Sequence, residues 1–222
     1  MGEPNYLSRR SRLVKGFNKT LGRIKPLLVS RYGEARARHL IKDAGMVYED
    51  LIPQVPYIGE NSPFLVFLLP TVKCLALYRA LQRQGGTVDE AGRLIYEMSE
   101  IELKAIPSVV RRLMGFLWFS PWFKNRARKR AASSQAREYP GNFVMQYVEG
   151  DGKRFDYGVN YTECANVKFL RSQGAMELAP YICATDKLSS EFLGWGLHRT
   201  KTLAEGADQC DFRFKKGGGT SI

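Results

Sequence analysis

Two thiols stand beside acids near the C-terminus: Cys183 three residues before Asp186 in "YICATDKLSS", and Cys210 directly before Asp211 in "QCDFRF". Residues three apart on a helix share a face, which predicts that Cys183 and Asp186 are neighbours. Alternation along the final strand turns Cys210 inward with Phe212. A thiolate is a strong nucleophile once its pKa is lowered, and a carboxylate can hold a cation or carry a proton. The pattern therefore predicts thiol-plus-carboxylate chemistry on an amidine, amide or thioester carbon.

The strand expected to pair with the last one carries a second group of candidates. In "GLHRTKTLA" the charged residues Arg199 and Lys201 are predicted to face water, which turns the alternate positions inward beside Cys210. With the thiol of the "EC" segment, these positions give a predicted substrate-binding set of Cys164, His198, Thr200 and Thr202. Structural interpretations remain open, since buried cysteines can simply pack, Asp186 can cap a helix, and a strand histidine can be held by hydrogen bonds.

The same side chains could alternatively bind a metal ion. Its thiolate-rich ligand set would be Cys164, Cys183 and Cys210, completed by Asp186 or His198, and zinc would be the metal. No two of the cysteines have the short C-x-x-C spacing of typical structural zinc sites. The sequence therefore favours a site without a metal, and nothing in it indicates an organic cofactor.

Length and composition predict a globular protein of a reducing compartment. The 222 residues are 44% hydrophobic and 12% aromatic, which is enough to bury a substantial core. The four cysteines lack the density of a secreted disulfide framework, and the N-terminal sequence lacks the apolar run of a secretory leader. We therefore expect a cytoplasmic protein with free thiols.

Hydrophobic periodicity predicts a helical layer in the first two-thirds of the chain. Apolar residues recur at helical spacing through residues 32–51 and 62–85, and the capping box "TVDE" opens a helix over 87–104. Pro107 then begins another helix, and Pro121 separates the apolar "LMGFLWFS" from the basic "KNRARKRAASSQAR". The apolar runs are too short or are interrupted by Pro and Lys, so no membrane span is expected.

After residue 140 the hydrophobic period changes from helical to alternating. A hairpin is predicted around the "DG" turn at 151–152 and a second around Gly206, with helices between them. The predicted fold class is α+β, with an N-terminal helical layer packed on roughly four antiparallel strands. The predicted parts are a basic segment 1–30, a helical layer 31–138 that forms one compact domain with a catalytic sheet-plus-helix portion 139–216, and a flexible tail 217–222.

Positive charge is concentrated in two segments of a chain whose net charge is +12. Residues 1–40 carry ten Lys or Arg against two acids, and residues 104–137 carry nine and no acid. Aromatics interleave with cations in "RRLMGFLWFSPWFKNRARKR", residues 111–130, a pattern suited to peripheral contact with an anionic membrane. The alternative is a helix pair with Trp118 and Trp122 packed inside. No nucleic-acid-binding motif accompanies the charge, so nucleic acid is not an expected partner.

Three short motifs in one stretch resemble a known family. In "YTECANVKFLRSQGAMELAPYICATDKLSSEFLGWGLHRTKTLAEGADQCDFRF" they are the Cys of "EC", a C-x-x-D and "TLAEG…CDF". Together they resemble the C-terminal signature of the L-2-amino-thiazoline-4-carboxylic acid hydrolase family, over roughly residues 32–215. The resemblance places the family's thiol and acid positions on Cys164, Cys183, Asp186 and Cys210, and its closing motif on Thr202, Gly206 and Asp211.

This resemblance implies the hydrolysis of a cyclic amidine. The thiazoline ring of a small-molecule substrate would open after attack on the amidine carbon and give a carbamoyl-cysteine. Cys183 or Cys210 would attack while Asp186 holds the amidine nitrogens, or water would attack directly and the thiols would only shape the site. The alternative function is a non-catalytic small-molecule-binding or scaffold domain, because the ending is also similar to that of vinyl-reductase-type domains.

Overall fold

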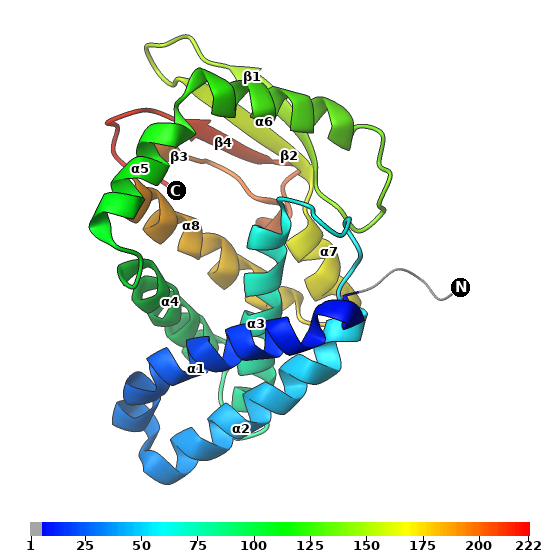
Figure 1. The fold of residues 1–222 in the computed structure, drawn as a ribbon, viewed down its shortest axis with the longest axis vertical. Coiled ribbons are helices and arrows are strands. Elements are labelled where there is room, and N and C mark those ends of the chain that lie inside the picture. Colours follow the sequence, from blue (N-terminus) through cyan, green and yellow to red (C-terminus); the bar gives the residue numbers. More distant parts are fainter. Residues whose placement is uncertain (1–5) are drawn as a thin grey trace. The chain divides into compact units, whose positions relative to one another are not determined.

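The computed structural model describes residues 6–222, which form eight α-helices and one open, four-stranded antiparallel sheet (Figure 1). The predicted α+β class with an N-terminal helical layer is confirmed. The helices are α1 Arg10–Tyr32, α2 Glu34–Leu51, α3 Leu65–Gln82, α4 Val88–Lys104, α5 Ser108–Trp118, α6 Pro121–Ser134, α7 Ala165–Ser172 and α8 Ala179–Leu193. The strands are β1 Val144–Glu149, β2 Tyr157–Glu163, β3 Leu197–His198 and β4 Cys210–Phe214.

Internal contacts divide the described chain into two compact units. The first comprises residues 6–102 and 169–182, and the second comprises residues 103–168 and 183–222. The second unit therefore contains the whole sheet, α5, α6 and most of α8. The boundaries predicted near residues 30, 138 and 216 stay predictions.

The first unit begins with a helix inside the segment for which the sequence indicated only basic character. α1 buries Phe17, Leu21 and Ile24, which lie three or four residues apart on one face. Its cations do not all face open water, since Arg31 pairs with Glu97 of α4 at 2.7 Å. Part of the N-terminal positive charge is thus neutralised within this unit.

α3 is the one helix in residues 6–222 whose length and composition would allow it to cross a membrane. Most of it, 61% of the 18-residue window, is buried inside the structure. Leu68, Val72 and Leu75 are fully covered. The central helix of a globular core passes the same test, so α3 is weak evidence for a membrane span.

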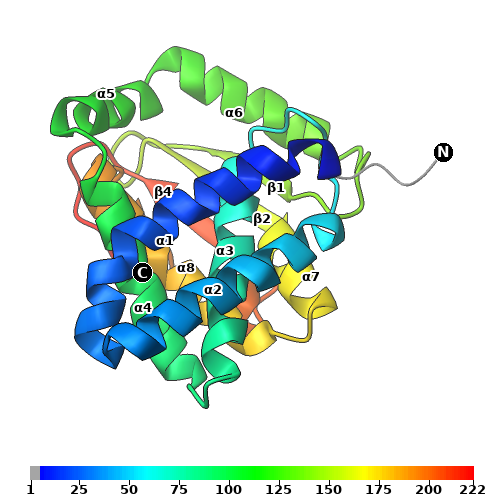
Figure 2. The same ribbon diagram turned by 60° about the horizontal axis from the view of Figure 1, so that its bottom comes forward.

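The sheet has the strand order β1-β2-β4-β3, so β4 is a central strand. Tyr161 of β2 lies opposite Cys210 of β4, and two ring contacts on the same face follow from this register, Tyr161 with Phe212 at 5.4 Å and Tyr157 with Phe214 at 5.0 Å. We call this the inner face. Helices of the second unit, α6 among them, lie against the sheet (Figures 1 and 2).

Residues 217–222, expected to be a flexible tail, make backbone hydrogen bonds in the structure. Ser221 N–H donates to Leu197 O at 2.8 Å, and Arg199 N–H donates to Ser221 O at 3.0 Å. The hydroxyls of Ser190 and Thr220 are 2.7 Å apart. This segment therefore lies beside the short strand β3 and supports the residues that follow it.

Candidate active site

The closing motif "TLAEG…CDF" forms a tight turn that ends at the sulfur of Cys210. Thr202 Oγ1 caps the 3₁₀ turn Leu203–Glu205 by accepting from Glu205 N–H at 3.2 Å, and Gly206 ends that turn with φ +87°. The turn directs Leu203 N–H at Cys210 Sγ, 3.2 Å away. The motif thus fixes a thiol on the inner face and supplies it with a backbone donor.

Asp211 of the same motif lies on the opposite face of the sheet and holds the neighbouring chain by hydrogen bonds. Its carboxylate accepts from Thr200 N–H at 2.9 Å, from Thr200 Oγ1 at 2.6 Å and from Lys201 N–H at 2.9 Å. These three bonds hold the connection that leaves β3. Asp211 therefore fixes the chain immediately after Arg199.

Asp186 of α8 is paired with Arg199, a residue that the alternating pattern predicts to face water. Arg199 Nη1 donates to Asp186 Oδ2 at 2.5 Å, and the guanidinium also lies 5.4 Å from the centroid of the Phe212 ring. The Arg199 side chain is 7% exposed and that of Asp186 is 33% exposed. The pair ties α8 to the inner face of the sheet and leaves the carboxylate accessible.

The inward set predicted for the strand before the turn is wrong by one residue. His198 and Thr200 are exposed, whereas Arg199 is buried. His198 lies opposite Arg213 in the β3–β4 pairing, and Arg213 points away from the inner face. A shift of one residue exchanges the two faces of a strand, and here Arg199 takes the inward position, where it pairs with Asp186. Thr202 is buried as predicted, but it serves as the cap described above.

Three thiols and Asp186 lie close enough to change one another's ionisation. Burial raises the pKa of Cys183 well above its usual value, and the charge of Asp186 raises it further. Burial likewise raises the pKa of Cys164 to about 12, against the opposing effect of Val167 N–H at the start of α7. Burial also raises the pKa of Cys210. All three thiols are consequently protonated at neutral pH in this state of the protein.

Asp186 differs from the thiols because its shifted pKa falls in the physiological range. Burial raises the pKa of this carboxyl to about 6, and the charge of Arg199 opposes the shift. Arg199 bonds to Oδ2, and within residues 6–222 no hydrogen bond reaches Oδ1. A group that is largely ionised at neutral pH, poorly hydrated and still accessible can accept a proton during a reaction.

Arg130 of α6 and Tyr161 of β2 extend this cluster. Burial lowers the pKa of Arg130, and Arg126 lowers it further. Arg130 has no ion pair or hydrogen bond to any residue in the described range 6–222. Burial also raises the pKa of Tyr161, the charge of Asp186 raises it further, and the charge of Arg130 lowers it. A half-buried cation without a partner is therefore close to the same phenol as the carboxylate.

The cysteines and Asp186 do not form a metal-binding geometry. In the part of the chain that the structure describes, no three His, Cys, Asp or Glu side chains are grouped so that they could hold a metal ion. The zinc alternative for Cys164, Cys183, Cys210 and Asp186 has no support from this arrangement. His198, its other possible ligand, is exposed.

The fold and this cluster define an α+β protein with three thiols of raised pKa near a partly exposed carboxylate and a buried arginine. The family model of L-2-amino-thiazoline-4-carboxylic acid hydrolase matches residues 69–214, about two-thirds of the chain. The chain belongs to this family, as its motifs predicted. No curated protein and no solved structure matches it. The family name supports a hydrolase, and the matched range contains all the site residues described above.

Proposed function

We propose that this protein hydrolyses a cyclic amidine bearing a carboxylate, of the 2-amino-thiazoline-4-carboxylate type, with Asp186 as the group that moves protons. The observation that carries the proposal is the Arg199–Asp186 pair, which holds a one-third-exposed carboxyl on the same helix as Cys183 in a chain of this hydrolase family. Burial raises the pKa of that carboxyl to about 6. Proton-transfer groups work best when their pKa lies near the operating pH. The thiols are within electrostatic reach of that carboxyl, and Cys183 is three residues away on the same helix.

Charge complementarity supports the choice of substrate class. An amidine is a planar cation when protonated, and Asp186 Oδ1 is available to accept a charge-assisted hydrogen bond from it. The substrate carboxylate requires a cation, and the guanidinium of Arg130 has no acid partner within residues 6–222. Tyr161, which is influenced by both charges, can donate from its phenol to either end of the substrate.

In the proposed reaction, Cys183 Sγ attacks the amidine carbon and Asp186 accepts the thiol proton. A cationic substrate beside Asp186 offsets the negative charge that raises the pKa of Cys183, so substrate binding itself favours the thiolate. A ring bond to the amidine carbon then breaks, and the proton returns from Asp186 to the departing ring atom. Water next attacks the same carbon and Asp186 accepts its proton. The enzyme thiol leaves and is reprotonated, so the net change is the addition of one water molecule.

Serine replacements test which thiol, if any, attacks. Cys183→Ser is expected to lower the single-turnover rate of ring opening at least about tenfold, because a hydroxyl is a much weaker nucleophile than a thiol. Cys164→Ser and Cys210→Ser should retain measurable turnover. Cys74→Ser is the matched control, since Cys74 is buried in α3 of the first unit. A wild-type single-turnover rate in Cys183→Ser would eliminate the covalent route and leave direct attack by water.

Arg130→Gln tests the carboxylate contact. KM for the thiazoline carboxylate is expected to rise about tenfold with little change in kcat, because the lost charge interacts with a group that does not react. An analogue that lacks the carboxylate should be hydrolysed equally by wild type and variant. Arg126→Gln, an exposed position on the same helix, is the control. Equal KM values for wild type and Arg130→Gln would show that Arg130 does not bind the carboxylate.

A further inference from the structure

Exposed apolar side chains are concentrated on α5 and the start of α6. Seven of the twelve large hydrophobic residues that are exposed in residues 6–222 lie within residues 109–122. Val109 is 73% exposed, Phe116 is 64% and Trp122 is 62%. We define the α5–α6 surface as Val109, Val110, Leu113, Phe116, Leu117 and Trp122. Isolated exposed hydrophobics are ordinary, but a continuous helical stripe of them is typical of a binding surface.

The orientation of α5 is fixed by contacts on its other side, within the second unit. A Cβ on Gly115 would lie 2.2 Å from Leu193 O, so the helix backbone directly contacts the end of α8. Trp118 stacks on Trp195 with ring centroids 4.2 Å apart. Arg111 lies over the Phe192 ring at 5.0 Å. These contacts occupy the inward face, so the exposed apolar stripe cannot turn inward without breaking them.

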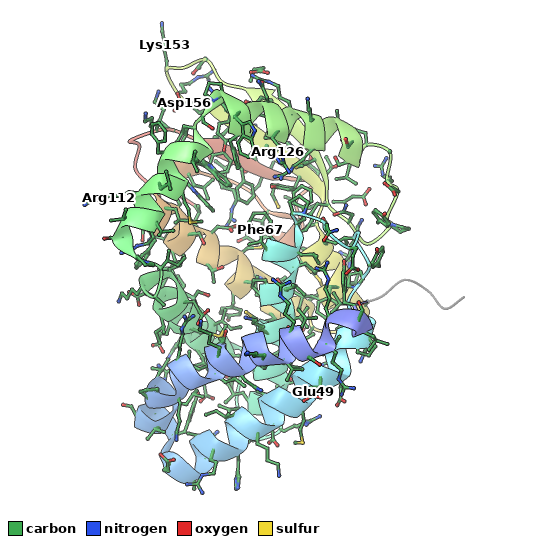
Figure 3. All side chains as sticks on the ribbon, in the orientation of Figure 1. Glu49, Phe67, Arg112, Arg126, Lys153 and Asp156 are labelled. Carbon is green, nitrogen blue, oxygen red and sulfur yellow. The ribbon has the colours of Figure 1, made fainter. Side chains whose placement is uncertain are left out.

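Cations are concentrated in the segment that carries this apolar stripe. Residues 104–137 include nine Lys or Arg and no Asp or Glu. Arg112 points away from the ribbon (Figure 3). Two exposed rings have a cation beside them, Phe116 with Lys216 at 5.7 Å and Trp122 with Arg126 at 5.4 Å. Aromatic and aliphatic side chains interleaved with cations are suited to a boundary between an apolar layer and an anionic layer.

We propose that the α5–α6 surface binds the surface of a membrane containing anionic phospholipids. A second copy of the chain is a poor occupant, because a symmetric contact would place the two cation clusters against each other. Nucleic acid would satisfy the cations but leave the apolar stripe in water. A lipid headgroup layer supplies negative charge, and the acyl chains beneath it accept Phe116 and Trp122. The proposal concerns a separate surface and does not depend on the hydrolase assignment.

Vesicle sedimentation with the 222-residue chain tests this surface. Wild type is expected to pellet with vesicles of phosphatidylcholine plus phosphatidylserine, to pellet little with phosphatidylcholine alone, and to dissociate as salt rises. The variant Val109→Glu/Phe116→Glu should bind at least about tenfold more weakly. Met46→Glu/Val66→Glu is the control, since it makes the same charge change at exposed apolar positions of α2 and α3. This control should bind like wild type.

Tryptophan fluorescence gives an independent measurement. Trp122 is 62% exposed, so its emission should shift to the blue on vesicles, and Trp122→Phe should abolish that shift because Trp118 and Trp195 are already stacked together. Absence of wild-type binding to phosphatidylserine vesicles would overturn the proposal. Equal loss of binding in both double variants would do the same. A lipid-free dimer that the Val109→Glu/Phe116→Glu change dissociates would instead assign the surface to self-association.

Discussion

Replacing Asp186 with Asn is expected to lower kcat/KM for a thiazoline carboxylate by roughly 10²–10⁴-fold, the usual contribution of a general acid–base group. Asparagine retains the size of the side chain and can still bond to Arg199, but it cannot accept a proton from a thiol or water. Asp208→Asn is the matched control, because Asp208 is an exposed acid paired with Lys201 at 2.7 Å. Steady-state kinetics of the two variants measure the difference. An Asp186→Asn enzyme with wild-type kcat/KM would refute the proposed proton acceptor.

The pH profile gives the same prediction a second readout. Because the ionised carboxylate is the reactive form and burial raises its pKa to about 6, wild-type kcat/KM should fall as pH drops through about 6. The contribution of Asp186 to the free energy of unfolding changes with pH in the direction opposite to activity. A carboxyl with a raised folded-state pKa contributes stability at low pH that is lost as pH rises through about 6. We therefore expect activity to fall on mild acidification because Asp186 becomes protonated, and this protonation does not unfold the protein.

Arg199→Met is expected to reduce both stability and activity. The guanidinium is 7% exposed, and its removal leaves Asp186 without its partner and Phe212 without its cation. Removing one partner of a buried ion pair typically costs 3–5 kcal/mol. Because Asp186 is partly exposed and can take up a proton, we expect a loss of about 2 kcal/mol in the free energy of unfolding. Activity should fall about 100-fold, since an Asp186 with a still higher pKa is protonated at neutral pH.

Chemical denaturation and a double-mutant cycle measure this coupling. The loss of unfolding free energy in Arg199→Met/Asp186→Asn should be smaller than the sum of the losses in the two single variants. Each single variant leaves one charge without its partner, whereas the double variant removes both charges. Arg128→Met is the control, since Arg128 pairs with Glu149 on the surface and exposed pairs contribute less than about 1 kcal/mol. Additive effects of Arg199→Met and Asp186→Asn would show that the two side chains are not coupled.

The parts of the site that could be predicted from sequence are those set by local spacing. Cys183 and Asp186 are three residues apart on one helix, and the alternation of the last strand placed Cys210 inward. The strand before it was assigned the wrong face, because hydrophobic patterning treats every arginine as exposed. Only the tertiary pairing of Arg199 with Asp186 reverses that rule. No local pattern in the sequence marks Arg199 as the partner of Asp186, which lies 13 positions away along the chain.

Tyr161 and Arg130 could not have been found by spacing, because each reaches the cluster through long-range pairing. Tyr161 lies opposite Cys210 only through the β2–β4 register, and Arg130 belongs to a cation-rich run that reads as a solvated helix face. The extra helix α1 was missed for a simpler reason. Its glycines, its internal Pro26 and its many cations mask a sparse apolar face, although the spacing of that face is regular.

The central position of β4 has a consequence for synthesis on the ribosome. β1 and β2 emerge together as a hairpin, but β2 acquires its other neighbour only when residues 210–214 have been made, and β3 joins the sheet only through the same strand. Until then the nascent chain presents an unpaired backbone edge next to aromatic side chains, the condition that favours misassociation before release.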